Sequence, residues 1–146
     1  MRERLAEDMK AAMRGKEELR LGTIRMIRSE IVNKDKEHGK EAAEEDILKV
    51  LQGMVKKREE AAEQFAKGGR PDLAAKERDE LAIVRSYLPA QLGDAELREA
   101  AQAAIAETGA ATVKDMGKVM GVLSKRLAGR AAGARISQAV KALLGG

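Results

Sequence analysis

The chain contains no cysteine and no tryptophan, and it has one histidine, one tyrosine and one phenylalanine in 146 residues. The absence of cysteine excludes disulfide bonds, thiolate metal sites and a cysteine nucleophile. Because aromatic side chains are so scarce, a hydrophobic core has to be built from Leu, Ile, Val, Met and Ala. Such a composition favours helices that pack on helices, and the chain is long enough to form a core of this kind.

Long apolar runs are absent as well. No stretch approaches the roughly 18 consecutive apolar residues of a membrane-spanning helix. The first ten residues, MRERLAEDMK, lack the apolar segment of a signal peptide. We therefore expect a cytoplasmic protein.

Positive charge is distributed unevenly along the chain. The formal net charge is only +4, but residues 116–146 carry six Lys or Arg and no acidic residue, which gives this segment +6. Residues 88–115 sum to −3. Sorting of charge along a sequence in this way indicates an anionic partner for the basic segment.

Apolar residues recur at spacings of three, four and seven along most of the chain, which predicts a series of amphipathic helices. Strand patterns are absent. Pro89 disfavours helical geometry at Leu88, so residues 87–94 (YLPAQLGD) are expected to be a hinge. We predict an all-α fold, with an N-terminal domain of about four helices over residues 1–90 and a small C-terminal domain of three helices over residues 91–146. The expected helix ends lie at Gly15, Gly39, Gly68, Gly109 and Gly129.

Residues that could carry out catalysis are few. The single histidine, His38, lies in the polar stretch KEHGKE at an expected helix end, where a surface position explains it. No histidine is placed to activate any of the four serines, and no glycine-rich phosphate loop is present. The basic stretches KKRE (56–59) and RMIRSE (25–30), and the pairs Glu63–Lys67 and Lys76–Glu80, indicate a solvated surface. We predict no catalytic, metal-binding or cofactor-binding residue.

The segment from Val113 to Leu127 has an unusual pattern. On a helix, its large apolar residues share one face, predicted to point toward the core: Val113, Met116, Val119, Met120, Leu123 and Leu127. Beside them lies a small-residue stripe, Gly117, Gly121 and Ser124, and beyond it a lysine stripe, Lys114, Lys118 and Lys125. Thr112–Asp115 (TVKD) resembles a capping box that begins this helix, with Asp in place of the usual Glu or Gln.

Two glycines inside one helix cost about 2 kcal/mol relative to alanine, so a compensating role is expected. One alternative is that another helix packs closely over the small-residue stripe. The other is that a nucleic-acid backbone lies on it while the lysines contact phosphates. No aromatic residue follows Tyr87, so RNA binding would use phosphate, ribose and shape rather than base stacking, and it would be sensitive to salt.

Taken in their order and spacing, five stretches resemble the GatB/YqeY-domain family. They are LRLGTIRMIRSEI (19–31), VKKREEAAEQFAKGGRPDLAAKE (55–77), YLPAQL (87–92), DMGKVM (115–120) and LAGRAAGARIS (127–137). The resemblance spans essentially the whole chain. It implies a small helical protein similar to the C-terminal module of the B subunit of the amidotransferase that amidates Glu-tRNA(Gln) or Asp-tRNA(Asn). That module contacts tRNA, whereas glutamine hydrolysis and carboxylate activation occur in other domains, so the resemblance implies tRNA as the partner and no active site.

The resemblance implies RNA contacts for Lys118 in DMGKVM, for Arg130 in AGRAAG, and for their neighbours. Together with the rest of the basic segment, the predicted RNA-binding residues are Lys114, Lys118, Lys125, Arg126, Arg130, Arg135 and Lys141, with Gly117 and Gly121 as positions of close backbone approach. One departure concerns Ala132, where the family usually has an acid that would cap the last helix. Loss of such a cap typically costs about 1 kcal/mol, and Gly133 is expected to serve as a weaker cap.

Two alternatives of other classes remain open. One is a component of a carbon–nitrogen ligase that uses glutamine as the amide donor, although the sequence contains no catalytic set for this chemistry. The other is a helical adaptor that binds another protein, such as an amidotransferase or tRNA synthetase component, through Gly117 and Gly121. The identity of the tRNA and the oligomeric state stay open at this point.

Overall fold

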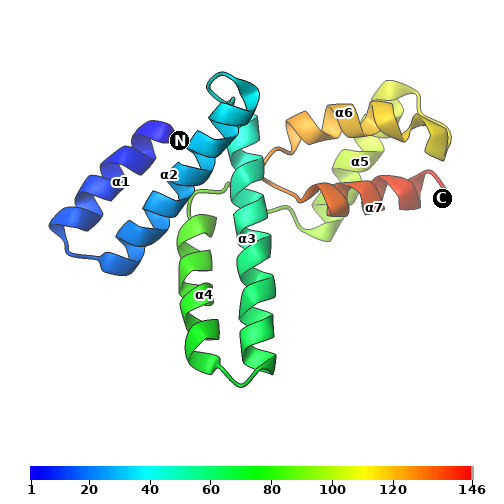
Figure 1. Ribbon diagram of the computed structural model, residues 1–146. Coiled ribbons are helices and arrows are strands. Elements are labelled where there is room, and N and C mark those ends of the chain that lie inside the picture. Colours follow the sequence, from blue (N-terminus) through cyan, green and yellow to red (C-terminus); the bar gives the residue numbers. More distant parts are fainter. Residues whose placement is uncertain (146) are drawn as a thin grey trace. The chain divides into compact units, whose positions relative to one another are not determined.

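The computed structural model describes residues 1–145, and within that range it contains seven α-helices, one 3-10 turn and no strand (Figure 1). The prediction of an all-α fold is confirmed. Backbone contacts divide the chain into two compact units, Met1–Leu88 and a second unit that begins at Pro89. None of the described helices is long and apolar enough to span a membrane. The helices are α1 (Arg2–Arg14), α2 (Glu18–His38), α3 (Glu44–Lys67), α4 (Pro71–Arg85), α5 (Asp94–Thr108), α6 (Met116–Arg126) and α7 (Gly133–Leu143), and the 3-10 turn η1 is Val113–Asp115.

The N-terminal unit is built from two helical pairs, α1 with α2 and α3 with α4, and α2 also packs on α3 and α4. Its hydrophobic core is built from aliphatic side chains, methionine and one tyrosine: Leu5, Ile24, Ile27, Ile31, Ala42, Ile47, Leu51, Met54, Val84 and Tyr87. The expected helix ends at Gly15, Gly39 and Gly68 are confirmed. Gly39 takes a left-handed conformation with φ 68°, which glycine adopts without steric penalty.

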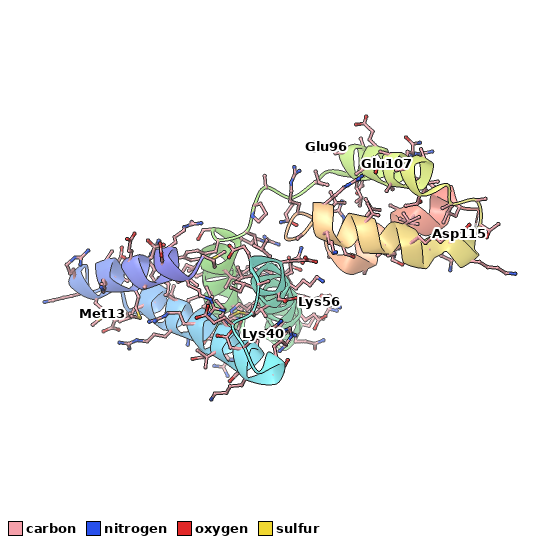
Figure 2. All side chains as sticks on the ribbon, turned by 90° about the horizontal axis from the view of Figure 1, so that it is seen from above. Met13, Lys40, Lys56, Glu96, Glu107 and Asp115 are labelled. Carbon is pink, nitrogen blue, oxygen red and sulfur yellow. The ribbon has the colours of Figure 1, made fainter. Side chains whose placement is uncertain are left out.

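Two residues of the predicted apolar stripes are not buried. Met13 near the end of α1 is 51% exposed (Figure 2), and Leu19 in the first turn of α2 is 39% exposed. Both lie next to the α1–α2 turn, where the two helices end and begin and no third helix covers them. Helical spacing predicts which residues share a face, but it does not predict where along the helix the covering partner stops.

A buried ion pair corrects the prediction that KKRE and the Lys76–Glu80 pair lie on a solvated surface. Arg58 on α3 is 7% exposed and Glu80 on α4 is 9% exposed, with Nε of Arg58 3.4 Å from Oε2 of Glu80. Arg58 follows Met54 by four residues and precedes Ala62 by four, so it continues the buried face of α3. Glu63 and Lys67 do form the predicted exposed pair, at 2.9 Å.

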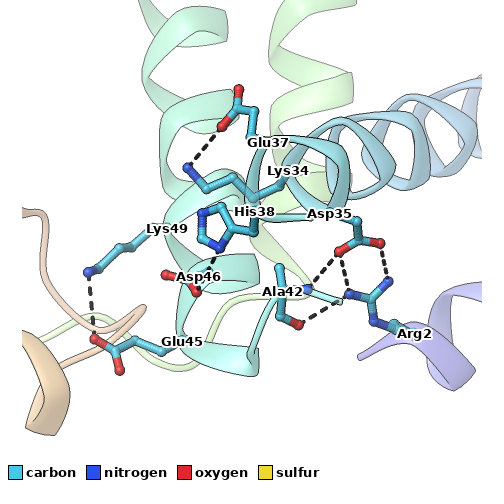
Figure 3. A network of polar contacts seen from close by, with 9 residues as sticks. All are labelled: Arg2, Lys34, Asp35, Glu37, His38, Ala42, Glu45, Asp46 and Lys49. Carbon is cyan, nitrogen blue, oxygen red and sulfur yellow. Dashed lines mark hydrogen bonds and ion pairs between the residues drawn. The ribbon is translucent and has the colours of Figure 1, made fainter. Parts of the chain in front are cut away.

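The loop between α2 and α3 is fixed by a clamp from α1 (Figure 3). The guanidinium of Arg2 donates two hydrogen bonds to the carboxylate of Asp35, at 3.0 and 2.8 Å, and one to the carbonyl of Ala42 at 3.2 Å. The backbone N–H of Ala42 donates to Asp35 at 2.7 Å. The hydrogen bond from Arg2 and then that from Ala42 lower the pKa of Asp35 to about 2.

The C-terminal unit is a three-helix arrangement in which α5, α6 and α7 each pack on the other two. Its core residues are Leu92, Leu97, Ala101, Ala104, Val119, Leu123, Leu127, Ala131, Ile136 and Val140. The backbone N–H of Leu92 donates to the carbonyl of Arg130 at 2.9 Å, which ties the segment before α5 to the loop between α6 and α7. This second core shows that the small C-terminal unit has its own hydrophobic interior.

The start of α7 differs from the prediction in one position. The N-cap residue is Ala132, with extended backbone geometry, and Gly133 is already the first helical residue. Gly133 is therefore not the cap. Since alanine has no side-chain acceptor and no capping hydrogen bond is present, the first turn of α7 lacks the stabilisation that an acid at position 132 would supply.

Candidate nucleic-acid interface

The helix that carries the predicted interface, α6, is preceded by the expected capping box. Thr112 and Asp115 form it, and the carboxylate of Asp115 accepts the backbone N–H groups of Ala111 at 2.9 Å and Thr112 at 3.2 Å. These two hydrogen bonds, together with the nearby charge of Lys118, lower the pKa of Asp115. Figure 2 shows Asp115 at this start of the helix. The capped turn is η1, and the α-helix itself begins at Met116.

The core-facing side of α6 is largely as predicted. Val119, Leu123 and Leu127 are buried, and Met116 and Met120 are partly buried. The prediction for Val113 is wrong, because this residue is 39% exposed. Val113 lies in η1, and a 3-10 turn has about three residues per turn, so a projection based on the α-helix misplaces its side chain.

The small-residue stripe is open. Gly117 and Gly121 are exposed, and a Cβ atom added at either position would meet no other atom within 4 Å. No other described helix of the C-terminal unit therefore packs closely over these glycines, and the packing alternative is wrong within this unit. The absence of side chains at these positions leaves the helix surface accessible to a ligand outside the chain.

The lysine stripe beside these glycines is also open. Lys114, Lys118 and Lys125 are exposed, and none forms a hydrogen bond or a close ion pair with another of residues 1–145. The charge of Lys118 does act on Asp115, whose pKa it helps to lower. On the α-helix, Lys118 and Lys125 are seven residues apart and so lie on the same side, next to Gly121. Lys141 is exposed as well, but it lies on α7.

The three predicted arginines have partners within the C-terminal unit. Arg126 donates to the carboxylate of Glu107 on α5, which raises the pKa of Arg126 and lowers that of Glu107. Nη2 of Arg135 lies 2.8 Å from the carboxylate of Asp94, and its Nη1 donates to the carbonyl of Leu92 at 3.1 Å. Nε of Arg130 donates to the carbonyl of Ala90 at 3.3 Å. These arginines help to hold the segment before α5, and α5 itself, against the loops around α6 and α7.

The structure thus divides the seven predicted RNA-binding residues into four lysines without a hydrogen-bond or ion-pair partner among residues 1–145 and three arginines that each have one, a backbone carbonyl in the case of Arg130. The lysines are unpaired and available to an anion, whereas the positive charge of Arg126 and Arg135 is partly neutralised by acids. Contact with RNA stays a prediction for each of them. We use the name α6 surface for Gly117, Gly121, Lys118 and Lys125 on α6 together with Lys114 in the preceding turn η1.

No comparable chemistry gathers around the single histidine. His38 lies in the last turn of α2, and its Nδ1 is 4.0 Å from the carboxylate of Asp46 (Figure 3). Among residues 1–145, no group of three or more His, Cys, Asp or Glu side chains is close enough to hold a metal ion. The α6 surface is therefore the candidate site that the geometry supports.

Comparison with known proteins agrees with the resemblance seen in the sequence. A family model for YqeY-like proteins matches residues 2–144. Three fungal relatives are each named altered inheritance of mitochondria protein 41, mitochondrial. The one from Pyrenophora tritici-repentis is 32% identical over 133 residues, which cover 88% of this chain and 71% of that protein.

The other two relatives match over a shorter region. The protein from Lachancea thermotolerans is 35% identical and that from Saccharomyces cerevisiae strain YJM789 is 33% identical, each over 85 residues. In both cases the match covers 58% of this chain and 46% of the relative. The family model, which extends over nearly every residue, is the broader finding. The chain therefore belongs to the YqeY-like protein family.

Proposed function

We propose that this protein is a tRNA-binding helical module, related to the amidotransferases that convert Glu-tRNA(Gln) or Asp-tRNA(Asn), and without an active site of its own. The observation that carries the proposal is the open α6 surface, in which two bare glycines lie beside unpaired lysines. Membership of the YqeY-like family supports it. We further propose that the protein acts in the cytoplasm, whereas the names of the fungal relatives call those proteins mitochondrial.

The α6 surface suits a sugar–phosphate backbone for two reasons. Without Cβ atoms at Gly117 and Gly121, a ribose or phosphate group can approach the helix more closely than it could over side chains. Lysine ammonium groups at Lys118 and Lys125 then meet phosphate oxygens as mobile point charges. Because no aromatic residue follows Tyr87, base stacking is not available in this unit, and recognition would depend on RNA shape and phosphate positions.

Charge reversal on the α6 surface tests the proposal. We expect the double variant Lys118→Glu/Lys125→Glu to bind tRNA roughly tenfold more weakly or worse at low salt, because two phosphate contacts become repulsive. The slope of log affinity against log salt should also become shallower, by about one for each phosphate contact that is lost. Binding is measured by fluorescence anisotropy with labelled tRNA over a range of salt concentrations.

A matched control separates this site from the overall charge of the protein. Lys10→Glu/Lys76→Glu changes the net charge by the same amount at two exposed lysines of the N-terminal unit. It should retain most of the affinity. Equal weakening in both double variants, or failure of the unmodified protein to retain tRNA at low salt, would mean that the α6 surface is not an RNA site.

The two alternative functions give different results in other assays. An enzyme would hydrolyse glutamine or amidate charged tRNA as a purified chain, and such activity would contradict the proposal of a module without an active site. An adaptor would recover a stoichiometric protein partner through Gly117 and Gly121, and this partner would persist after RNase treatment. We expect neither outcome, because the lysine stripe beside the glycines matches a polyanion.

A further inference from the structure

A second cationic feature lies in the N-terminal unit, in a pocket of about 260 Å³ between α2 and α3. It brings together two basic stretches, RMIRSE and KKRE, that are 26 residues or more apart in the sequence. We call it the α2–α3 pocket, and its lining residues are Arg25, Met26, Ser29 and Glu30 from α2 with Met54, Lys57 and Arg58 from α3. None of these residues belongs to the α6 surface.

The innermost cation of the pocket, Arg58, has few good hydrogen-bond acceptors. Its Nη1 is 3.5 Å from the carbonyl of Met54, at the limit of a hydrogen bond, and its Nη2 is 3.6 Å from the sulfur of Met26, a weak acceptor. Nε is fully buried and makes no hydrogen bond, although the carboxylate of Glu80 lies 3.4 Å away. A guanidinium carries five N–H donors, and Arg58 is 93% buried, so most of these donors have neither water nor a good acceptor. Buried donors without acceptors lower the free energy of unfolding.

The rest of the pocket is polar and positively charged. Arg25 and Lys57 are exposed at its edge, and neither forms an ion pair with another residue in the range 1–145. Ser29 contributes a hydroxyl that can donate, and Glu30 contributes the single acid of the lining. Three cations and one acid line the pocket, and the ion pair of Arg58 with Glu80 behind it leaves a net charge of about +1. The pocket thus combines a buried donor, two exposed cations and a hydroxyl, and such groups hold a small anion.

We propose that the α2–α3 pocket binds a phosphomonoester. Such a group carries about −1.5 to −2 at pH 7 and has three strong acceptor oxygens, which suit the donors of Arg25, Ser29, Lys57 and Arg58 in the lining. A carboxylate or a backbone phosphodiester has only two terminal oxygens and would leave more of these donors without an acceptor. The volume is slightly below the roughly 300–1,000 Å³ of pockets that enclose drug-sized ligands, so it fits a phosphate head group rather than a whole nucleotide.

Within this pocket, the phosphate oxygens accept the N–H groups of Arg58 that now face only sulfur and a distant carbonyl. Lys57 and Arg25 pair with the outer oxygens, and Ser29 donates its hydroxyl. The ion pair with Glu80 holds the guanidinium in place from the α4 side. The proposal therefore assigns a role to Arg58 beyond its contribution to packing.

Titration with inorganic phosphate tests the proposal, with the side-chain Nε–H signal of Arg58 observed by ¹⁵N NMR. A parallel titration with sodium chloride, at the same ionic strength and without sulfate, gives the shift that is due to ionic strength alone. We expect a saturable shift of the Arg58 signal with phosphate only. Absence of a saturable shift, or an equal shift with chloride, would overturn the proposal.

Variants at the exposed edge keep the test independent of folding. Lys57→Gln and Arg25→Gln should each weaken phosphate binding roughly fivefold, the effect of losing one exposed charge contact. Lys56→Gln is the matched control, since Lys56 is also exposed on α3 but does not line the pocket (Figure 2). If Lys56→Gln weakens binding as much as Lys57→Gln, the effect is general electrostatic attraction and the proposal is wrong.

The source of the phosphate is distinguished with two short RNAs of the same sequence, one with a 5′-phosphate and one with a 5′-hydroxyl. A phosphomonoester site shifts the Arg58 signal with the first and with a sugar phosphate, but not with the second. An equal response to the 5′-hydroxyl RNA would assign the pocket to backbone phosphodiesters and refute the proposal. Phosphate binding should be unchanged in Lys118→Glu/Lys125→Glu. The Arg58 signal therefore tests the phosphate proposal, and the tRNA anisotropy tests the proposed function, independently of each other.

Discussion

The two units of the molecule use positive charge in different ways. In the N-terminal unit, arginines pair with acids from other helices: Arg2 with Asp35, Arg58 with Glu80, and Arg85 with Glu59. In the C-terminal unit Arg126, Arg130 and Arg135 also have partners, but the lysines of α6 and α7 have none among the described residues. The planar guanidinium holds elements together, whereas the lysine ammonium stays at the surface.

The difference shows that the formal charge of a segment can be larger than the charge that is free to contact a ligand, because acids from other segments pair with part of it. Residues 116–146 carry +6, but Glu107 and Asp94 from α5 partly neutralise Arg126 and Arg135. Apart from Arg98 and Arg130, which have no acidic partner among the described residues, the available charge of the C-terminal unit lies on lysines. In the N-terminal unit, the sequence predicts Arg58 as part of a solvated surface, but the structure buries this arginine with donors that lack acceptors.

The largest expected effect is on the free energy of unfolding, where a substitution of Arg58 is compared with substitutions of the lysines of α6. Arg58→Met should lower the free energy of unfolding of the N-terminal unit by about 3 kcal/mol, since it leaves the buried carboxylate of Glu80 without a partner. Lys118→Met/Lys125→Met should change stability by less than about 0.5 kcal/mol per site, because these side chains are exposed and unpaired. Urea unfolding followed by circular dichroism measures both.

The double variant Arg58→Met/Glu80→Met is the control for this prediction. Removal of both charges should recover much of the lost stability, because apolar side chains of similar size can replace a buried ion pair. Equal stability of Arg58→Met and Lys118→Met/Lys125→Met would contradict the distinction between structural and available cations.

The next effect compares two pairs of open helical glycines. Gly117 and Gly121 on α6 and Gly22 and Gly53 on α2 and α3 all have free space where a Cβ would lie. Replacement of either pair by alanine should raise the unfolding free energy by at most about 2 kcal/mol. Only Gly117→Ala/Gly121→Ala should also weaken tRNA binding, because its methyl groups keep the backbone away from α6.

Both glycine variants are measured by urea unfolding and by tRNA anisotropy. If the α6 variant gains stability with no change in tRNA affinity, RNA does not approach the helix at these glycines. An equal loss of affinity in the Gly22→Ala/Gly53→Ala control would indicate an effect on the whole protein.

A smaller effect concerns the uncapped start of α7. Ala132→Asp places a carboxylate at the N-cap, where it can accept backbone N–H groups of the first turn, and should stabilise the C-terminal unit by about 1 kcal/mol. Ala142→Asp near the opposite end of the same helix is the control, and it should be neutral or destabilising. Thermal unfolding compares the two variants, and equal effects would argue against capping.

The smallest effect is confined to acidic pH. The pKa of Asp35 is about 2 in the folded protein, below its ordinary value near 3.8, so its contribution to stability is fully present above about pH 4 and is lost as the pH falls toward 2. Asp35→Asn should remove that part of the pH dependence while leaving the fold intact. Melting temperatures between pH 2 and pH 5 measure it. An unchanged pH profile in the variant would show that the clamp with Arg2 does not stabilise the N-terminal unit.

Helical periodicity predicted most of the elements, because each helix buries one face and glycine and proline mark its ends. It failed at Val113, where the backbone changes from α to 3-10 geometry, and at Leu19 and Met13, where no covering helix extends far enough. Arg58 could have been found from its spacing of four from Met54 and Ala62. The partners of Arg126, Arg130 and Arg135 could not, since they lie 19 to 43 residues away in sequence.

The sequence by itself determined the all-α class, the positions of the helices, the capped start of α6 and the basic character of the C-terminal segment. These features depend on local preferences and on the pattern of neighbouring residues. Only the tertiary structure decided that no other described helix of the C-terminal unit covers Gly117 and Gly121, which cations are paired, and that Arg25, Lys57 and Arg58 share one pocket. Those facts depend on which helices meet in space, and contacts between residues far apart in sequence leave no local pattern.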